Sequence, residues 1–352
     1  MLKKIIFAFT LIIFSFSAKA DTQSLISSVY GTVANKHITP VNIEELAISG
    51  LKSISDIDKN LIFSNGKDVV YIYYHRKIAG VWHKPQHNDD YKAWADLTAK
   101  IIHKATLISA RAKHYKIMLT ENILAHAIAS LNDHSKYHFS DEVEDFFDGR
   151  EIAAYPDGRY LYIQVLSFDA DTKDYIKNSI LRYPQTQAVI LDLRGNKGGQ
   201  LNVAIDVAKL FIDDGIIVST KGQTKEATKY YVAKQENAFT LPLAVLIDQG
   251  TASSAEALAA ALHEQAQAIL IGTQTYGKGT IQDIFAFDNG GRLALTTGEF
   301  FTPSGEKVEK IGIWPDYCII NDRLVDGPCT QQQRADNPSD IEFAKQVLYE
   351  QL

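Results

Sequence analysis

The sequence is poor in cysteine: Cys318 and Cys329 are the only two among 352 residues, and they lie eleven positions apart near the C-terminus. Two cysteines without a cluster of histidines make a poor zinc site. In a chain that has the pattern of an exported protein, this pair predicts a disulfide that closes a short loop.

Long apolar runs are also scarce, and the prominent one lies at the N-terminus, where Lys3 and Lys4 precede a run from Ile5 to Phe16. Together with the following Ala-Lys-Ala, this pattern predicts a secretory signal peptide over residues 1–20 and a periplasmic or secreted mature protein. The run is too short to span a bilayer comfortably, and no later stretch is long enough. No cysteine lies near the predicted cleavage site, so no lipid anchor or other stable membrane anchor is expected.

The chain has no excess of basic residues. Its formal net charge is −6, and without the predicted signal peptide it is −9. This charge argues against nucleic acid or an anionic membrane as the partner. The composition is that of an ordinary globular protein without internal repeats, and its length predicts about two domains.

The histidines of the N-terminal third do not form a metal-binding motif, because none has the H-E-x-x-H spacing that puts two ligands on one helix face. We expect them to be surface or packing residues, and we expect no metal and no cofactor. They include His75, His83, His87, His103, His114 and His126.

Two further catalytic motifs are missing. Residues Gly272–Lys278 almost complete a phosphate-binding P-loop, but Gly279 stands where Ser or Thr should bind magnesium. The residues that follow, Thr280–Phe287 and Arg292–Thr297, have the pattern of a β-hairpin and not of the required helix. The G-x-S-x-G elbow of α/β-hydrolases is absent as well.

Two regions of different pattern are present. From Asp21 to about Ser140 the apolar spacing predicts mainly helices, including Ile43–Ser53 and a long stretch Tyr91–Leu131, with a short strand Val69–Tyr74. After a turn at Tyr155–Gly158, apolar strands alternate with helices, which predicts parallel β-α-β units. The predicted strands are Tyr160–Leu166, Ala188–Leu193, Leu243–Ile247 and Ala268–Ile271, and the predicted helices are Thr172–Arg182, Leu201–Ile212 and one that starts at Ser253.

In such sheets, ligands bind beyond the carboxyl ends of the strands. The loops that follow the predicted strands are Arg194–Gly199, Asp248–Ser253 and Thr273–Gly277. We therefore expect a glycine loop, a serine and the neighbouring Lys278 to meet at one rim of the sheet.

The serine and the lysine in these loops suit nucleophilic catalysis. A serine hydroxyl needs a base to take its proton, and a lysine amine can serve if burial or cationic neighbours lower its pKa from about 10.4. Ser-Lys pairs are a known variant of the catalytic triad. The alternative is structural, because Ser253-x-x-Glu256 before an apolar run is also a helix capping box. The two interpretations are compatible, since a helix start offers backbone N–H groups and a positive dipole end.

The glycine loop is a tight turn when it is considered alone. Beside a serine nucleophile, an N–H of Gly198 or Gly199 together with that of Ser254 would form an oxyanion hole.

Several ordered motifs resemble the carboxyl-terminal processing (tail-specific) peptidases of family S41. They are the runs Val189–Gly199, Val245–Glu256 and Ile271–Gln282, followed by the closing runs Phe301–Gly305 and Gly312–Asp316. Upstream, Leu131–Tyr137 is similar to the family's L-D-P-H-S-x-Y segment, with Asn-Asp in place of Asp-Pro. The strong resemblance covers about residues 160–317.

This resemblance implies a crotonase-like (ClpP/crotonase) α/β core. It also implies that Ser253 is the nucleophile, that Lys278, twenty-five positions later, is the general base, and that Gln282 orients the lysine. Glu264 falls where some members carry an acidic residue, but it is equally consistent with a solvent-facing position on a helix. The expected division is a signal peptide (1–20), a mainly helical domain (21–145), a catalytic core (146–317) and a C-terminal extension (318–352).

One part of the family pattern is missing. In typical members a PDZ domain, which binds substrate C-termini, lies between the H-S-x-Y segment and the first core strand. Here only about twenty residues separate Tyr137 from Tyr160. The sequence therefore predicts an exported PDZ-less serine endopeptidase that acts on proteins or peptides, as a homo-oligomer or with an adaptor. The alternative is a peptide- or ligand-binding protein of the same fold with little turnover.

Overall fold

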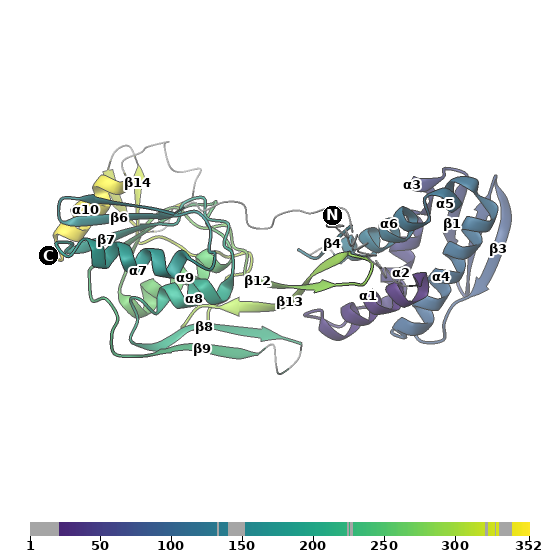
Figure 1. Cartoon of the computed structure of the whole chain (residues 1–352), viewed down its shortest axis with the longest axis horizontal. Coiled ribbons are helices and arrows are strands. Elements are labelled where there is room, and N and C mark those ends of the chain that lie inside the picture. Colours follow the sequence, from purple (N-terminus) through teal and green to yellow (C-terminus); the bar gives the residue numbers. More distant parts are fainter. Residues whose placement is uncertain are drawn as a thin grey trace, which may run out of the picture.

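The computed structural model of the chain describes residues 21–131, 134–139, 152–223, 225, 228–320, 323–327, 329–330 and 340–352. The predicted signal peptide lies outside them, as do residues 132 and 133 of the upstream motif. Two bodies lie at opposite ends of an elongated molecule, and a long β-hairpin runs between them (Figure 1).

The N-terminal body is mainly helical. Its helices are α1 (Thr22–Lys36), α2 (Ile43–Lys52), α3 (Ile54–Ile57), α4 (Tyr91–Ile108), α5 (Ala110–His114) and α6 (Lys116–Ala129). The long stretch predicted from Tyr91 to Leu131 is thus three helices. It breaks at Ser109, whose hydroxyl caps α5 by accepting the Ala112 N–H at 3.0 Å and donates to Asp58 at 2.7 Å.

The predicted strand Val69–Tyr74 is β2, and it is the middle strand of an antiparallel sheet with β1 (Leu61–Asn65) and β3 (Lys77–His83). The sequence did not indicate β3, because the turn that leads to it is made by His75 and Arg76 at φ 48° and 64°, without the usual Asn-Gly signal.

The C-terminal body is built on a mixed sheet. Within the described residues its strand order is β15-β14-β11-β10-β7-β6-β5, with parallel pairing from β6 to β14 and antiparallel edge strands. The strands are β5 (Ile152–Asp157), β6 (Tyr160–Val165), β7 (Ala188–Asp192), β10 (Leu243–Ile247), β11 (Ile269–Gly272), β14 (Tyr317–Ile320) and β15 (Arg323–Asp326). The predicted parallel β-α-β units are confirmed.

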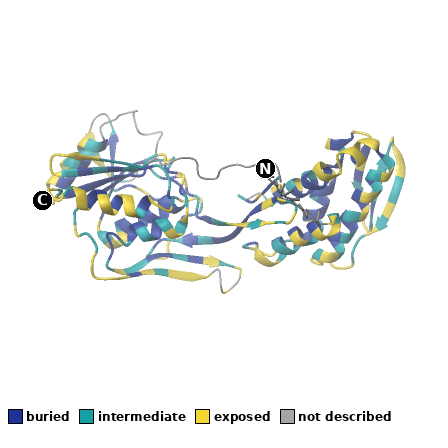
Figure 2. Cartoon of the chain, in the orientation of Figure 1, coloured by how far each residue is buried: buried dark blue, intermediate teal, exposed yellow. Residues whose placement is uncertain are grey.

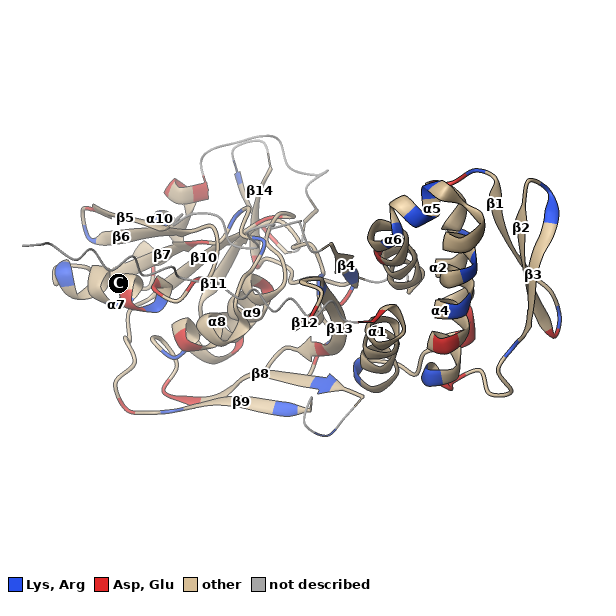
Figure 3. Cartoon of the chain, turned by 45° about the vertical axis from the view of Figure 1, so that its right-hand side comes forward, with Lys and Arg blue, Asp and Glu red and all other residues tan. Residues whose placement is uncertain are grey.

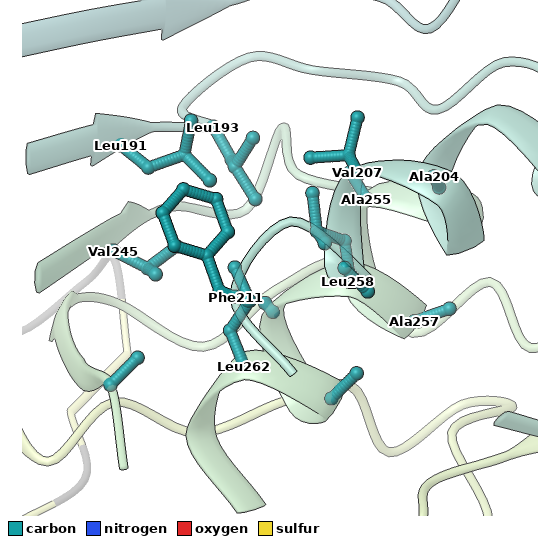
Figure 4. Close-up of a cluster of buried hydrophobic side chains, with 14 of the residues drawn as sticks. Leu191, Leu193, Ala204, Val207, Phe211, Val245, Ala255, Ala257, Leu258 and Leu262 are labelled. Atoms are coloured by element: carbon teal, nitrogen blue, oxygen red, sulfur yellow. The ribbon is translucent and has the colours of Figure 1, made fainter. Parts of the chain in front are cut away.

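Helices cover both faces of this sheet. Helices α7 (Thr172–Arg182), α8 (Leu201–Ala208) and α9 (Ser254–Ala266) pack on one face around Phe211, Leu191, Val245 and Leu258 (Figure 4). Helix α10 (Asp340–Tyr349) packs on the other face against Ile190, Leu246 and Ile271. Because side chains alternate along a strand, each central strand supplies both layers, and all five residues of β7 and of β10 are buried (Figure 2).

A second sheet of the same body has the order β12-β13-β8-β9, from strands β8 (Asp214–Gly222), β9 (Lys229–Lys234), β12 (Thr280–Ala286) and β13 (Arg292–Phe301). The short strand β4 (Lys136–His138) also pairs with β13. The hairpin β12–β13 confirms the expectation for residues 280–297. Its distal residues Leu293 and Leu295 are buried in the N-terminal core, whereas Phe300 lies in the C-terminal core.

Candidate active site

Ser253 lies at the start of α9, at the carboxyl-end rim of the sheet, because the loop from β10 leads directly into that helix. Its backbone has φ 59° and ψ −125°, a region that is unfavourable for a residue with a side chain. Such a conformation costs about 1–3 kcal/mol and persists only where its surroundings enforce it.

The carboxylate of Glu256 provides that enforcement. Its Oε2 accepts the N–H of Ser253 at 2.8 Å, which is one half of the predicted capping box, and also the N–H of Lys278 at 2.9 Å. Its Oε1 accepts the N–H of Gly277 at 2.7 Å and the hydroxyl of Thr275 at 2.5 Å. Glu256 is fully buried, and burial raises its pKa while these four donors lower it. One buried carboxylate thus holds the serine loop and the lysine loop together.

Lys278 is half-buried, directly after this clamp and before β12. Burial lowers the pKa of its amine, and the positive charge of Lys136 lowers it further, against the opposing charges of Glu309 and Glu256. A lowered pKa increases the neutral fraction that can accept a proton. Lys136 belongs to the upstream motif and reaches this neighbourhood through the pairing of β4 with β13.

The glycine loop packs directly against the serine. A Cβ placed on Gly198 would lie 2.9 Å from the Cβ of Ser253 and 3.0 Å from the hydroxyl oxygen of Ser254, so only glycine fits. The Gly198 backbone also has φ 98°, which favours glycine. The expectation that the glycine loop, the serine and the lysine meet at one rim is therefore met.

The two glycine amides differ. The N–H of Gly198 donates to Oδ1 of Asn196 at 2.7 Å, so it is engaged within the loop. Among the described residues, the amides of Gly199 and Ser254 make no comparable bond to a side chain. The Gly198 N–H thus already has an acceptor within the loop.

The remaining candidates have structural partners. The amide of Gln282 donates to Thr280 Oγ1 at 3.0 Å and to Thr296 Oγ1 at 3.3 Å, on the hairpin that starts after Lys278. Glu264 is exposed near the far end of α9, and its carboxylate accepts the N–H of Ser304 at 2.6 Å. Its position is the one expected for a solvent-facing helix residue.

A buried polar network behind the glycine loop was not expected from the sequence. Asp192, at the end of β7, accepts the Tyr162 hydroxyl at 2.7 Å and two guanidinium nitrogens of Arg194 at 2.5 and 2.9 Å. The sequence feature that could have indicated this network is Asp192, a carboxylate at the end of an otherwise apolar strand, with Arg194 two positions later. Such a buried charge must be paired.

The expected disulfide is present between Cys318 on β14 and Cys329. Among the described residues, no group of three or more potential ligand side chains is placed to hold a metal ion. In the same part of the chain, each helix is too short or too polar to cross a membrane.

Residues 159–319 match peptidase family S41. This segment is therefore an S41 peptidase segment, and the resemblance seen in the sequence is confirmed.

The particular relatives are carboxyl-terminal-processing proteases. The one from Synechocystis is 34% identical over 186 residues, which cover 52% of this chain and 42% of the relative. The carboxy-terminal processing protease CtpA of Bacillus subtilis is 42% identical over 158 residues, which cover 44% and 33%. The match thus spans less than half the length of either relative.

Among solved structures, a lipoprotein from Streptococcus agalactiae is similar in fold, with a TM-score of 0.53 and 19% identity over 90% of this chain and all of that one. This similarity extends the fold relationship beyond the S41 segment to both bodies.

Proposed function

We propose that the protein is an exported serine endopeptidase that hydrolyses peptide bonds of protein substrates through Ser253 and Lys278. The observation that carries the proposal is the shared clamp: Glu256 Oε2 binds the backbone N–H of both residues. The S41 relatives, which are proteases, support the same activity.

In the proposed reaction, the neutral amine of Lys278 takes the proton of the Ser253 hydroxyl as its oxygen attacks the scissile carbonyl carbon. The N–H groups of Gly199 and Ser254 stabilise the oxyanion that forms. The tetrahedral adduct collapses to an ester with Ser253, and the Lys278 ammonium returns its proton to the leaving amine. A water molecule, deprotonated by Lys278, then attacks the ester carbonyl carbon. The adduct collapses to the product acid, and the Lys278 ammonium returns its proton to the departing Ser253 oxygen.

We assign Gln282 to the orientation of Lys278, because its amide is fixed by two threonine hydroxyls on the strand pair adjoining the lysine. No metal or other cofactor is needed for these steps.

The proposal extends to the whole chain. We infer a signal peptide over residues 1–20, a periplasmic or secreted location, a helical domain over 21–145, a crotonase-like core over 146–317 and a C-terminal extension over 318–352. Both signs of charge occur on both bodies (Figure 3), which is consistent with protein substrates and not with nucleic acid.

The test is cleavage of an unfolded protein, casein, by residues 21–352 and by the variants Ser253→Ala and Lys278→Ala, with products identified by mass spectrometry. We expect both variants to lose at least 1000-fold of the wild-type rate. Ser304→Ala is the matched control, since that residue contacts Glu264 far from the serine.

A fluorophosphonate probe separates the peptidase from a binding protein of the same fold. Labelling of the wild type but not of Ser253→Ala supports catalysis. A wild type that neither reacts with the probe nor cleaves casein, while still binding peptides, would favour the binding protein.

A further inference from the structure

Helix α10 begins at a buried carboxylate that contacts the rear of the candidate site. Asp340, its first residue, is fully buried, and its Oδ2 accepts a hydrogen bond from the guanidinium of Arg194 at 2.8 Å. The two residues are 146 positions apart in the sequence. Asp340 also lies outside residues 159–319, the segment that defines the family.

The guanidinium of Arg194 is held from two sides. Asp192 binds it through Nε and one terminal nitrogen, and Asp340 binds the other terminal nitrogen. Both carboxylates are fully buried, and the arginine supplies a positive charge to both. A planar guanidinium with both ends occupied has little freedom to rotate.

Arg194 is the first residue of the glycine loop, and several of the loop residues that follow it are held by hydrogen bonds. The N–H of Gly195 donates to Asp248 Oδ1 at 2.9 Å, and the Asn196 side chain donates to the Val165 carbonyl at 2.9 Å and accepts from the Gly198 N–H. Gly199 follows directly. The position of Arg194 therefore helps to set the backbone path of the loop that ends at Gly199.

Other residues of α10 are attached to the sheet and to neighbouring side chains. Ala344, Val347 and Leu348 pack on the sheet, and Lys345 forms ion pairs with Asp157 and Glu342. Within the described part of the chain, the Asp340–Arg194 hydrogen bond links the start of α10 to the first residue of the glycine loop.

We propose that Asp340 is a positioning residue. By holding Arg194, it connects the C-terminal helix to the glycine loop and so fixes the orientation of the Gly199 N–H toward the oxyanion. This inference rests on the proposed peptidase function for its catalytic consequence, but its structural part stands on the Asp340–Arg194 contact alone. It assigns to α10 a role in turnover in addition to covering the sheet.

The catalytic test compares Asp340→Asn with Lys345→Met, which removes an ion pair of the same helix at a distance from Arg194. For Asp340→Asn we expect kcat on a peptide substrate to fall about tenfold with KM changed less than twofold, because oxyanion stabilisation acts on the transition state. Lys345→Met should keep the wild-type kcat. Equal kcat for the wild type and Asp340→Asn, or equal losses in both variants, would overturn the proposal.

A second measurement does not depend on activity. Hydrogen exchange at the hydrogen-bonded amides of Gly195, Asn196 and Gly198 should be at least tenfold faster in Asp340→Asn than in the wild type and unchanged in Lys345→Met. If the wild type cleaves nothing but this difference is seen, the proposed function fails and the link between α10 and the loop stands. If exchange is the same in all three proteins, the link itself is refuted.

Discussion

At the scale of the residue, Glu256 connects the two halves of the proposed catalytic pair, although its sequence context is that of an ordinary helix cap. Its carboxylate oxygens each accept two hydrogen bonds, from Ser253 and Lys278 on one and from Thr275 and Gly277 on the other. No other side chain of similar size could accept all four.

Replacing Glu256 with glutamine tests this clamp. The amide has one acceptor oxygen instead of two, so two of the four donors lose their acceptor, at about 1–3 kcal/mol for each buried group. We expect Glu256→Gln to lower the free energy of unfolding by about 2–6 kcal/mol and the cleavage rate roughly 100-fold. Urea denaturation and casein hydrolysis measure the two effects.

The matched control is Glu342→Gln, whose carboxylate is 72% exposed. It should behave as the wild type in both assays. A Glu256→Gln protein with normal activity would show that the shared carboxylate is not required for the pair.

The pH dependence of cleavage follows from Lys278. Burial and the charge of Lys136 lower the pKa of this amine below its ordinary value. In the proposed mechanism the neutral amine is the active form. Activity should therefore rise with pH through that lowered pKa and level off above it. Steady-state rates from mildly acidic to alkaline pH give the profile, and a flat profile would contradict the role of Lys278.

The neighbour Lys136 provides a finer test. Lys136→Met removes a positive charge, so the pKa of Lys278 should rise and the ascending limb should move to more alkaline pH. Lys100→Met, which alters an exposed lysine paired with Asp96 in the N-terminal body, should leave the limb in place. A shift in the opposite direction would mean that Lys136 does not act through its charge.

At the scale of the element, the disulfide joins β14 to a segment that lies against the lysine loop. The backbone carbonyl of Cys329 accepts the N–H of Gln274 at 3.0 Å, four residues before Lys278. The bond therefore ties the C-terminal strand to the elements of the site.

The double variant Cys318→Ser/Cys329→Ser should be less stable by about 2–3 kcal/mol, because the unfolded chain regains the freedom of a short loop. Urea denaturation with and without a reducing agent measures the loss. Reduction should destabilise the wild type alone, and an equal response of both proteins would indicate that the bond does not contribute.

The elements also show why the sequence predicted some boundaries and not others. Helix α7 agrees with its predicted range, because its buried positions, Thr172, Ile176, Ser179 and Ile180, recur at helical spacing. The stretch from Tyr91 was expected to be continuous, since apolar residues persist through Ser109. The break there depends on Asp58, fifty-one positions away, which local spacing cannot reveal.

At the scale of the whole molecule, the hairpin β12–β13 couples the two bodies. One end follows Lys278, and the other places Leu293 and Leu295 in the N-terminal core. The N-terminal body thus packs against the hairpin that carries Gln282. The candidate site is connected to both bodies through this hairpin.

Leu295→Ala tests this coupling. The residue is fully buried, so its truncation should lower the free energy of unfolding by about 2–5 kcal/mol. Because the hairpin adjoins the lysine, we also expect cleavage to fall several-fold at temperatures where the protein remains folded. Ile284→Ala on the neighbouring strand, where the side chain is 52% exposed, is the control. Loss of stability in Leu295→Ala with normal cleavage would show that the bodies act independently.

The sequence by itself determined the layered α/β body, the candidate serine and lysine and the cysteine pair. Strand and helix periodicity and motif spacing are local properties, because they depend only on residues that are close together in the sequence.

Only the tertiary structure decided which groups act together. It showed that Glu256 serves both loops, that the Gly198 N–H is engaged by Asn196, that Arg194 is held by Asp340, and that the hairpin belongs to both cores. These are contacts between residues distant in sequence or choices among competing hydrogen-bond donors. They follow from the path of the backbone in space, which no local pattern specifies.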